Sequence, residues 1–89
     1  MAVDITVQET PNPHARRFVL DRPVQEHSRG RFFTDAASTE DTLAKRLLEL
    51  DGVEAAMLLP TSITLNKAAD ASWEDVESAA RAALTDYFA

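Results

Sequence analysis

The sequence predicts a two-layer α+β domain over residues 1–89, in which a mainly antiparallel sheet of four to five strands carries two helices on one face. Apolar and polar residues alternate at Val3, Ile5 and Val7, as in a strand with one buried face. Leucines recur at helical spacing at Leu43 and Leu47. The link between the first two strands is too short for a parallel crossover, which predicts an antiparallel pair. The expected order is strand, strand, short strand, helix, strand, strand, helix.

The first two strands are joined by a stiff corner, Thr10-Pro11-Asn12-Pro13. Each proline fixes its own φ and disfavours helical geometry in the residue before it. Asn12 suits a turn because its side chain can bond to nearby backbone groups. Residues 16–20 then form a second strand, with Phe18 on one face and Arg17 on the other.

In the middle of the chain, the sequence predicts a short edge strand over residues 31–34, in which Phe32 and Phe33 are expected to cover the core. Ser38 or Thr39 can cap a helix that runs from about Glu40 to Leu50. Gly52 follows at the position where a left-handed cap ends a helix.

The last third predicts a hairpin and a long helix. Residues 53–59 are apolar on both alternating faces, which suits a central strand, and residues 62–66 return as its partner. Ser72 caps the final helix. The apolar stripe of that helix is Trp73, Val76, Ala80, Ala83, Leu84 and Tyr87. We expect Trp73 to be a core anchor.

Composition limits the classes of function. The net charge of −6 disfavours general nucleic-acid binding, because phosphate groups repel an acidic domain. The sequence holds no cysteine, which excludes disulfides and thiolate ligands. It has no apolar run near the roughly 20 residues of a membrane span and no signal or transit pattern. We therefore expect a cytoplasmic protein that does not bind membranes.

Arginines crowd the first third of the chain, and the later part is acidic. They could form one basic patch or a dispersed solvated surface, and we favour the second interpretation because they can point in different directions. His14 and His27, with Asp21, Glu26 and Asp35 nearby, could be imagined as a metal site. The ligand spacing of known metal motifs is absent, and the glycines and serines match no phosphate loop or nucleophile elbow. We expect no enzyme activity, no catalytic or metal site and no cofactor.

Several segments together resemble the N-terminal domain of Nfu/NifU-type iron–sulfur scaffold proteins. Gln8 to Pro13 with Arg17-Phe18 is similar to the family's E-x-T-P-N-P-x-x-x-K-F, with arginine where lysine is usual. Four further segments match in order: Arg22-Pro23-Val24, residues 43–53, residues 62–67 and residues 70–74. Thr42 stands where the family usually has proline.

The resemblance implies an accessory domain. The scaffolds hold their cluster in a second domain with a C-x-x-C motif, and this sequence ends at Ala89 without a cysteine, so we expect a domain that stands alone. Cluster ligands cannot be carried over to any position. The implied role is engagement of iron–sulfur acceptor or assembly proteins.

At the corner, Pro11, Pro13 and Phe18 are expected to be structural, while Asn12, His14, Arg16 and Arg17 are the candidate contacts for a protein partner. An alternative function is a module that binds a peptide or small ligand through an uncovered sheet face, unrelated to iron–sulfur chemistry. The oligomeric state does not follow from the sequence.

Overall fold

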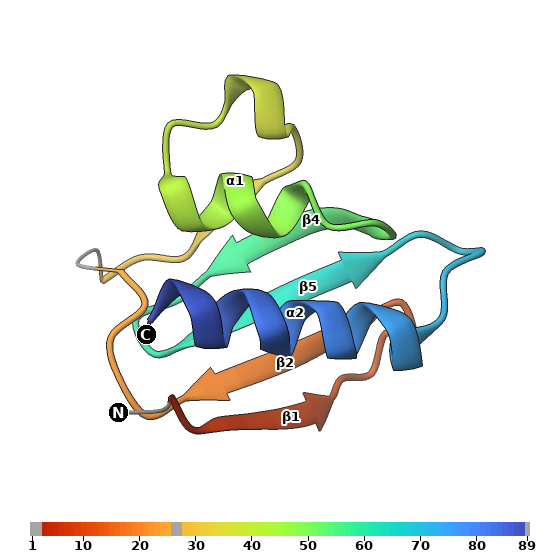
Figure 1. Cartoon of the computed structure of the whole chain (residues 1–89), viewed down its shortest axis with the longest axis horizontal. Helices are drawn as coiled ribbons and strands as arrows, with labels where there is room; N and C mark the ends of the chain where they lie inside the picture. Colours follow the sequence, from red (N-terminus) through yellow and green to blue (C-terminus); the bar gives the residue numbers. More distant parts are fainter. Residues whose placement is uncertain (1–2, 26–27, 89) are drawn as a thin grey trace.

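The computed structural model describes residues 3–25 and 28–88 and confirms the predicted α+β fold. One sheet has the strand order β1-β2-β5-β4-β3, and every neighbouring pair is antiparallel. Both helices lie on the same side of this sheet (Figure 1). The elements, in chain order, are β1 (Ile5–Glu9), β2 (Ala15–Leu20), β3 (Arg31–Phe33), a 3-10 turn (Ala36–Ser38), α1 (Thr42–Leu48), β4 (Val53–Leu58), β5 (Ser62–Lys67) and α2 (Trp73–Tyr87).

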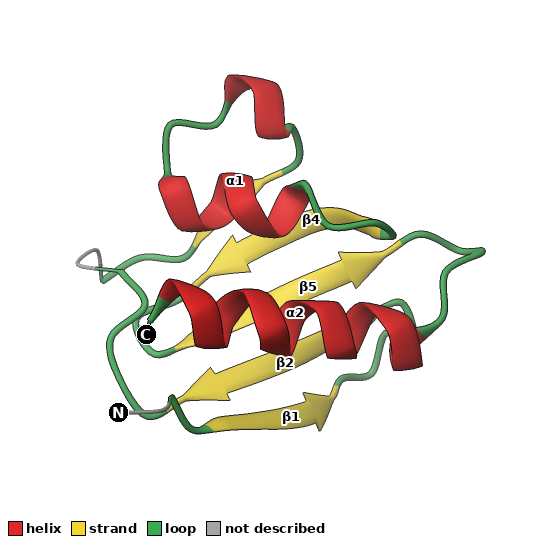
Figure 2. Ribbon diagram, in the orientation of Figure 1, coloured by secondary structure: helices red, strands yellow, loops and turns green. Residues whose placement is uncertain are grey.

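The core lies between the sheet and the two helices, as Figure 2 shows most simply. Strand register explains how it forms: Phe18 lies opposite Val7 on one side and Ile63 on the other, so apolar side chains from β1, β2 and β5 share one face. The helices cover this face with buried residues from both α1 and α2. The largest fully buried apolar side chains are Phe18, Leu43, Leu47, Leu58, Ile63, Leu65, Val76 and Leu84.

Helix α1 is shorter than predicted and begins later. Its N-cap is Asp41, whose Oδ1 accepts a hydrogen bond from the Ala44 amide at 3.0 Å. The prediction of Ser38 or Thr39 as the cap was wrong, because those residues belong to a separate 3-10 turn that Asp35 caps. Several neighbouring residues could cap a helix by their residue type alone. The 3-10 turn, which has no strong sequence pattern, takes up the earlier ones and leaves Asp41 to cap α1.

Strand β3 occurs where predicted, but only one of its phenylalanines faces the core. Phe33 packs against the core cluster, whereas Phe32 is 57% exposed. Adjacent strand residues point to opposite faces, so the expectation that both rings cover the core was wrong.

Helix α2 begins as predicted, with the Ser72 hydroxyl accepting a hydrogen bond from the Glu74 amide at 3.2 Å. Gly52 has the expected positive φ, 88°, but it does not cap the first helix: α1 ends at Leu48 with Glu49 as its C-cap, and Gly52 lies in the following turn, which the Val53 amide closes by donating to the Leu50 carbonyl at 3.2 Å. The apolar stripe of α2 is buried from Val76 to Leu84, but its two ends differ: Trp73 is half-buried and Tyr87 is exposed.

The sheet face away from the helices carries no helix of the described chain (Figure 1). We call it the open face and define it by one row of residues that runs across all five strands. Strand register places these residues side by side in the order Gln8, Arg17, Thr64, Met57 and Phe32.

Candidate partner-binding site

The corner between β1 and β2 is ordered by hydrogen bonds among its own residues. The Thr10 hydroxyl accepts from the Asn12 amide at 3.2 Å and lies 2.9 Å from the Asn12 carbonyl and 3.0 Å from the Ala15 carbonyl, to which it can donate. The side-chain oxygen of Asn12 accepts from the His14 amide at 2.9 Å, which is an Asx turn. With two prolines in the same segment, the loop has few alternative conformations.

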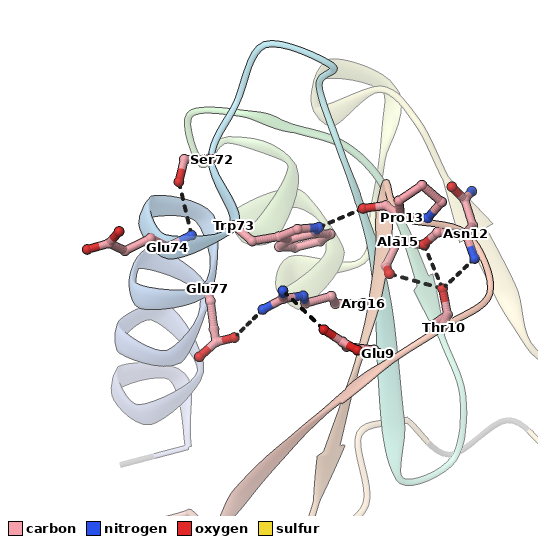
Figure 3. A network of polar contacts seen from close by, with 10 residues as sticks. All are labelled: Glu9, Thr10, Asn12, Pro13, Ala15, Arg16, Ser72, Trp73, Glu74 and Glu77. Carbon is pink, nitrogen blue, oxygen red and sulfur yellow. Dashed lines mark hydrogen bonds and ion pairs between the residues drawn. The ribbon is translucent and has the colours of Figure 1, made fainter.

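Helix α2 holds this corner in place from the far end of the sequence. The indole Nε1–H of Trp73 donates to the Pro13 carbonyl at 2.9 Å (Figure 3). The His14 carbonyl accepts from the Lys67 amide at 2.8 Å, which continues the β2–β5 pairing into the loop. The corner is therefore fixed to both the sheet and α2.

The charged side chain of Arg16 contacts Trp73 and two carboxylates beside the corner. Its guanidinium lies 5.1 Å from the centre of the Trp73 ring and pairs with Glu77 at 2.9 Å, with Glu9 at 3.8 Å (Figure 3). A cation over a tryptophan ring is attracted by the ring's electron-rich face. Arg16 thus has a structural role on the helix side of the sheet, and its contact with a partner stays a prediction.

The four residues predicted to contact a partner do not form one patch. Asn12 and His14 lie exposed on the corner, Arg16 lies half-buried beside α2, and Arg17 lies exposed on the open face. A shallow hollow of about 260 Å³ is lined by residues 9–13, 15 and 16. The corner and the open face are therefore two separate candidate surfaces.

The arginines of the first third of the chain are dispersed, which supports the interpretation of a solvated surface. Arg22 pairs with Asp21 at 3.0 Å, and Arg31 pairs with Asp41 at 2.7 Å. The hydrogen bond from Arg22 lowers the pKa of the Asp21 carboxyl below its usual value. These pairs lie on different elements from Arg16 and Glu77, so no single basic patch results.

The imagined metal site cannot be assembled from the described residues. His27 and Glu26 lie outside them. In residues 3–25 and 28–88, no group of three or more histidine, cysteine, aspartate or glutamate side chains is placed to hold a metal ion. That the protein works without a metal or a catalytic residue stays a prediction. In the same residues, no helix is long and apolar enough to cross a membrane.

Sequence reasoning missed the role of Trp73, which was expected to be a core anchor. It does pack against the core, but it also links the corner to α2 across 60 residues of sequence. A long-range contact of this kind has no local pattern. One observation in the sequence pointed to this contact. The resemblance to the family covers both the corner and residues 70–74, which include Trp73.

Replacing Trp73 by phenylalanine should remove the hydrogen bond to the Pro13 carbonyl and keep an aromatic ring at the same position. The ring remains, but the Pro13 carbonyl loses its donor, so we expect a loss of about 0.5–1.5 kcal/mol in the free energy of unfolding. Amide hydrogen exchange at Ala15, which donates to Asn12, should become faster. Urea unfolding and exchange measured by NMR would check both, with Tyr87→Phe on the exposed end of α2 as the control. Equal effects of the two substitutions would contradict the proposed link.

Comparisons with known proteins identify the family of this chain. The sequence profile described as "Scaffold protein Nfu/NifU N terminal" matches residues 5–89. Over 86 residues the chain is 33% identical to the human NFU1 iron-sulfur cluster scaffold homolog, mitochondrial, covering 96% of this chain and 34% of that protein. Over 84 residues it is 30% identical to NifU-like protein 4, mitochondrial, of Arabidopsis thaliana, covering 94% of this chain and 30% of that protein. The chain thus spans about a third of the length of these relatives.

Solved structures show the same fold. The crystal structure of protein SAV1430 from Staphylococcus aureus aligns with a TM-score of 0.81 at 24% identity, covering 94% of this chain and 99% of that one. The solution structure of SeR13 from Staphylococcus epidermidis aligns with a TM-score of 0.62 at 22% identity, covering 94% and 98%. With the profile match over most of its length, this chain belongs to the family of the Nfu/NifU scaffold N-terminal domain.

Proposed function

We propose that residues 1–89 act as one accessory domain that engages iron–sulfur acceptor or assembly proteins and does not itself hold a cluster. Family membership supports the iron–sulfur context, since the family is described by its scaffold proteins and the human relative is named an iron-sulfur cluster scaffold homolog. The absence of cysteine from the sequence supports a role without thiolate ligation. A non-enzymatic action and a cytoplasmic location belong to the same proposal, although two of the relatives carry mitochondrial names.

The observation that carries the proposal is the preorganised corner. Internal hydrogen bonds and Trp73 fix its backbone, yet Pro11, Asn12, Pro13 and His14 remain exposed. A loop that is already ordered loses little conformational entropy when it binds, so more of its contact energy appears as affinity. The arrangement favours recognition over chemistry, because the corner presents side chains without a nucleophile and base in contact.

A tagged chain purified from its cell of origin would test this function. We expect iron–sulfur acceptor or assembly proteins to be enriched, and His14→Ala to reduce their recovery by about fivefold, as for a contact worth about 1 kcal/mol. His14 takes part in the corner's hydrogen bonds through its backbone amide and carbonyl, so the substitution should leave the fold intact. Lys45→Ala, which changes an exposed residue of α1, is the control. Recovery of no such proteins, or equal recovery with His14→Ala, would count against the proposal.

A further inference from the structure

Strand β1 forms one free edge of the sheet (Figure 1). It contains neither proline nor lysine, and its pairing with β2 runs without a bulge. Native proteins use such features, or very short strands, to keep an edge from pairing with another chain. The opposite edge, β3, has protection of this kind, because it is three residues long and begins with the charged Arg31. The edge of β1 is therefore the one that is open to a further strand.

The backbone groups at the edge of β1 can be assigned from two hydrogen bonds. The Asp21 amide donates to the Asp4 carbonyl at 3.2 Å, so the backbone of Asp4 points towards β2. Backbone direction alternates along a strand of an antiparallel pair, so every second residue after Asp4 points the same way. Arg81 of α2 supports this assignment, since its guanidinium donates to the Ile5 carbonyl at 3.4 Å. The residues of β1 whose amides and carbonyls point away from β2 are Ile5, Val7 and Glu9.

A second copy of β1 fits this edge in an antiparallel register centred on Val7. In that register Val7 lies opposite Val7 of the second copy, Thr6 lies opposite Gln8, and Ile5 lies opposite Glu9. The two valines form a β-branched apolar pair, and threonine and glutamine can hydrogen-bond to each other. The residues that point away from β2 lie opposite one another, so they can exchange backbone hydrogen bonds between the copies. The register brings no like charges together.

Charge selects both this register and its occupant. Arg81 lies at the Ile5 carbonyl, the position that Glu9 of the second copy would face. Both groups are on the helix side of the sheet, because Glu9 lies opposite Arg16, whose guanidinium contacts α2. The Glu9 side chain is 87% exposed and lies 3.8 Å from Arg16, so its carboxylate is available to another cation. A two-fold axis repeats the contact, so each Glu9 meets the Arg81 of the other copy.

A strand of a different protein has no such built-in match. It would need an acidic side chain opposite Ile5 and a basic group beside Glu9, on the same side of the sheet and in that order. The chain's own β1 and α2 supply both, since the same two elements carry Glu9 and Arg81. A surface that complements itself in this way is the defining property of a two-fold interface.

Size and total charge limit the strength of the contact. One pair of five-residue strands is small against the roughly 1,200 Å² that a stable complex buries. The net charge of −6 on each copy also opposes association. At about 0.15 M salt, however, exposed charges more than about 8 Å apart are largely screened, so the local ion pairs dominate. We therefore expect a reversible dimer that depends on concentration.

We propose that two copies of the chain associate through β1, antiparallel and centred on Val7, with Glu9 of each copy paired with Arg81 of the other. The two sheets then form one continuous sheet, with the helices of both copies on the same side. This inference does not rest on the proposed function, because it assigns a second copy to an edge of the sheet and makes no use of the corner.

Amide hydrogen exchange of the unsubstituted chain at two concentrations tests the pairing directly. We expect the amides of Ile5, Val7 and Glu9 to exchange at least about threefold more slowly at about 1 mM than at about 50 μM, because pairing buries them in the dimer. The amides of Thr6 and Gln8 already face β2, so their exchange should not change and they serve as the control within the same strand. Sedimentation over the same concentrations should show monomers turning into dimers.

A charge exchange tests the register. Glu9→Arg alone and Arg81→Glu alone should each raise the dissociation constant of the dimer by at least about tenfold, because like charges then face each other twice. An equal mixture of the two variants should dimerise about as well as the original chain, because each new charge meets its opposite in the other variant. Lys45→Glu, a charge reversal on α1, should leave the dissociation constant unchanged. Thermal unfolding of each variant would establish that its fold is intact.

Four results would overturn the inference. They are a chain that stays monomeric up to about 1 mM, a dimer that neither Glu9→Arg nor Arg81→Glu weakens, folded single variants whose mixture does not dimerise, and slower exchange at other amides than those of Ile5, Val7 and Glu9. Should a variant fail to fold, the exchange of the unsubstituted chain still decides whether β1 pairs with itself.

Discussion

Phe18→Ala is expected to lower the free energy of unfolding by about 3–5 kcal/mol, the range for a large aromatic side chain removed from a core. Phe18 is fully buried on β2 and lies between Val7 of β1 and Ile63 of β5. Its loss would leave a cavity beneath α2 at the middle of the sheet. A domain of this length has a total stability of roughly 5–13 kcal/mol, so the variant should be close to unfolded.

The neighbouring residue provides a matched control for Phe18. Val19 is on the same strand but points to the open face and is half-buried. Val19→Ala should cost less than about 1 kcal/mol, because few of its contacts lie in the core. Chemical denaturation of both variants would measure the difference. Similar losses would mean that the two faces of the sheet are not distinguished as described.

Gly52→Val is expected to lower the free energy of unfolding by about 2–4 kcal/mol, from backbone strain and overpacking together. The φ of 88° lies in the region that side chains with a branched Cβ rarely adopt. A Cβ at this position would also lie 3.0 Å from both Ala71 Cβ and Val76 Cγ2. Val76 is buried, so it cannot move away at low cost.

The other glycine of the chain separates these two causes. Gly30 has no positive φ, and the atom nearest to a Cβ there belongs to the end of the Leu59 side chain, which can move. Gly30→Ala should therefore cost less than about 1 kcal/mol, whereas Gly52→Ala should retain much of the loss seen with valine. Thermal or urea unfolding of the three variants would check the order. A Gly52 variant as stable as the original chain would contradict the left-handed conformation of Gly52 in this turn.

The sequence was sufficient for elements whose signal is local. Alternation in residues 3–7 and 16–20 predicted the first hairpin, and Ser72 marked the start of α2 because capping depends on one or two neighbouring residues. Gly52 marked a position of positive φ, although α1 ends earlier, at Leu48. The start of α1 was harder, since five capping residues lie close together between 35 and 42. Their hydrogen bonds separated the 3-10 turn from the helix, and Arg31 on a different element also engages Asp41.

The candidate site depended on contacts that no local pattern contains. The sequence marked the corner as stiff, and the structure shows the same segment held by its own side chains. Arg16 and Arg17 are adjacent in sequence, yet strand geometry sends them to opposite faces of the sheet. One meets Trp73 and Glu77 from α2, and the other meets the open face. Which arginine was available could be decided only once the position of α2 was known.

The central claim is that this chain engages iron–sulfur proteins without holding a cluster itself. The most direct measurement is anaerobic co-purification of the tagged chain from its cell of origin, with identification of the bound proteins and determination of iron and sulfide in each separated component. The account predicts that iron–sulfur acceptor or assembly proteins co-purify, and that the separated chain contains neither iron nor sulfide in stoichiometric amount. Stoichiometric iron in the chain, or the absence of iron–sulfur proteins among its partners, would contradict it.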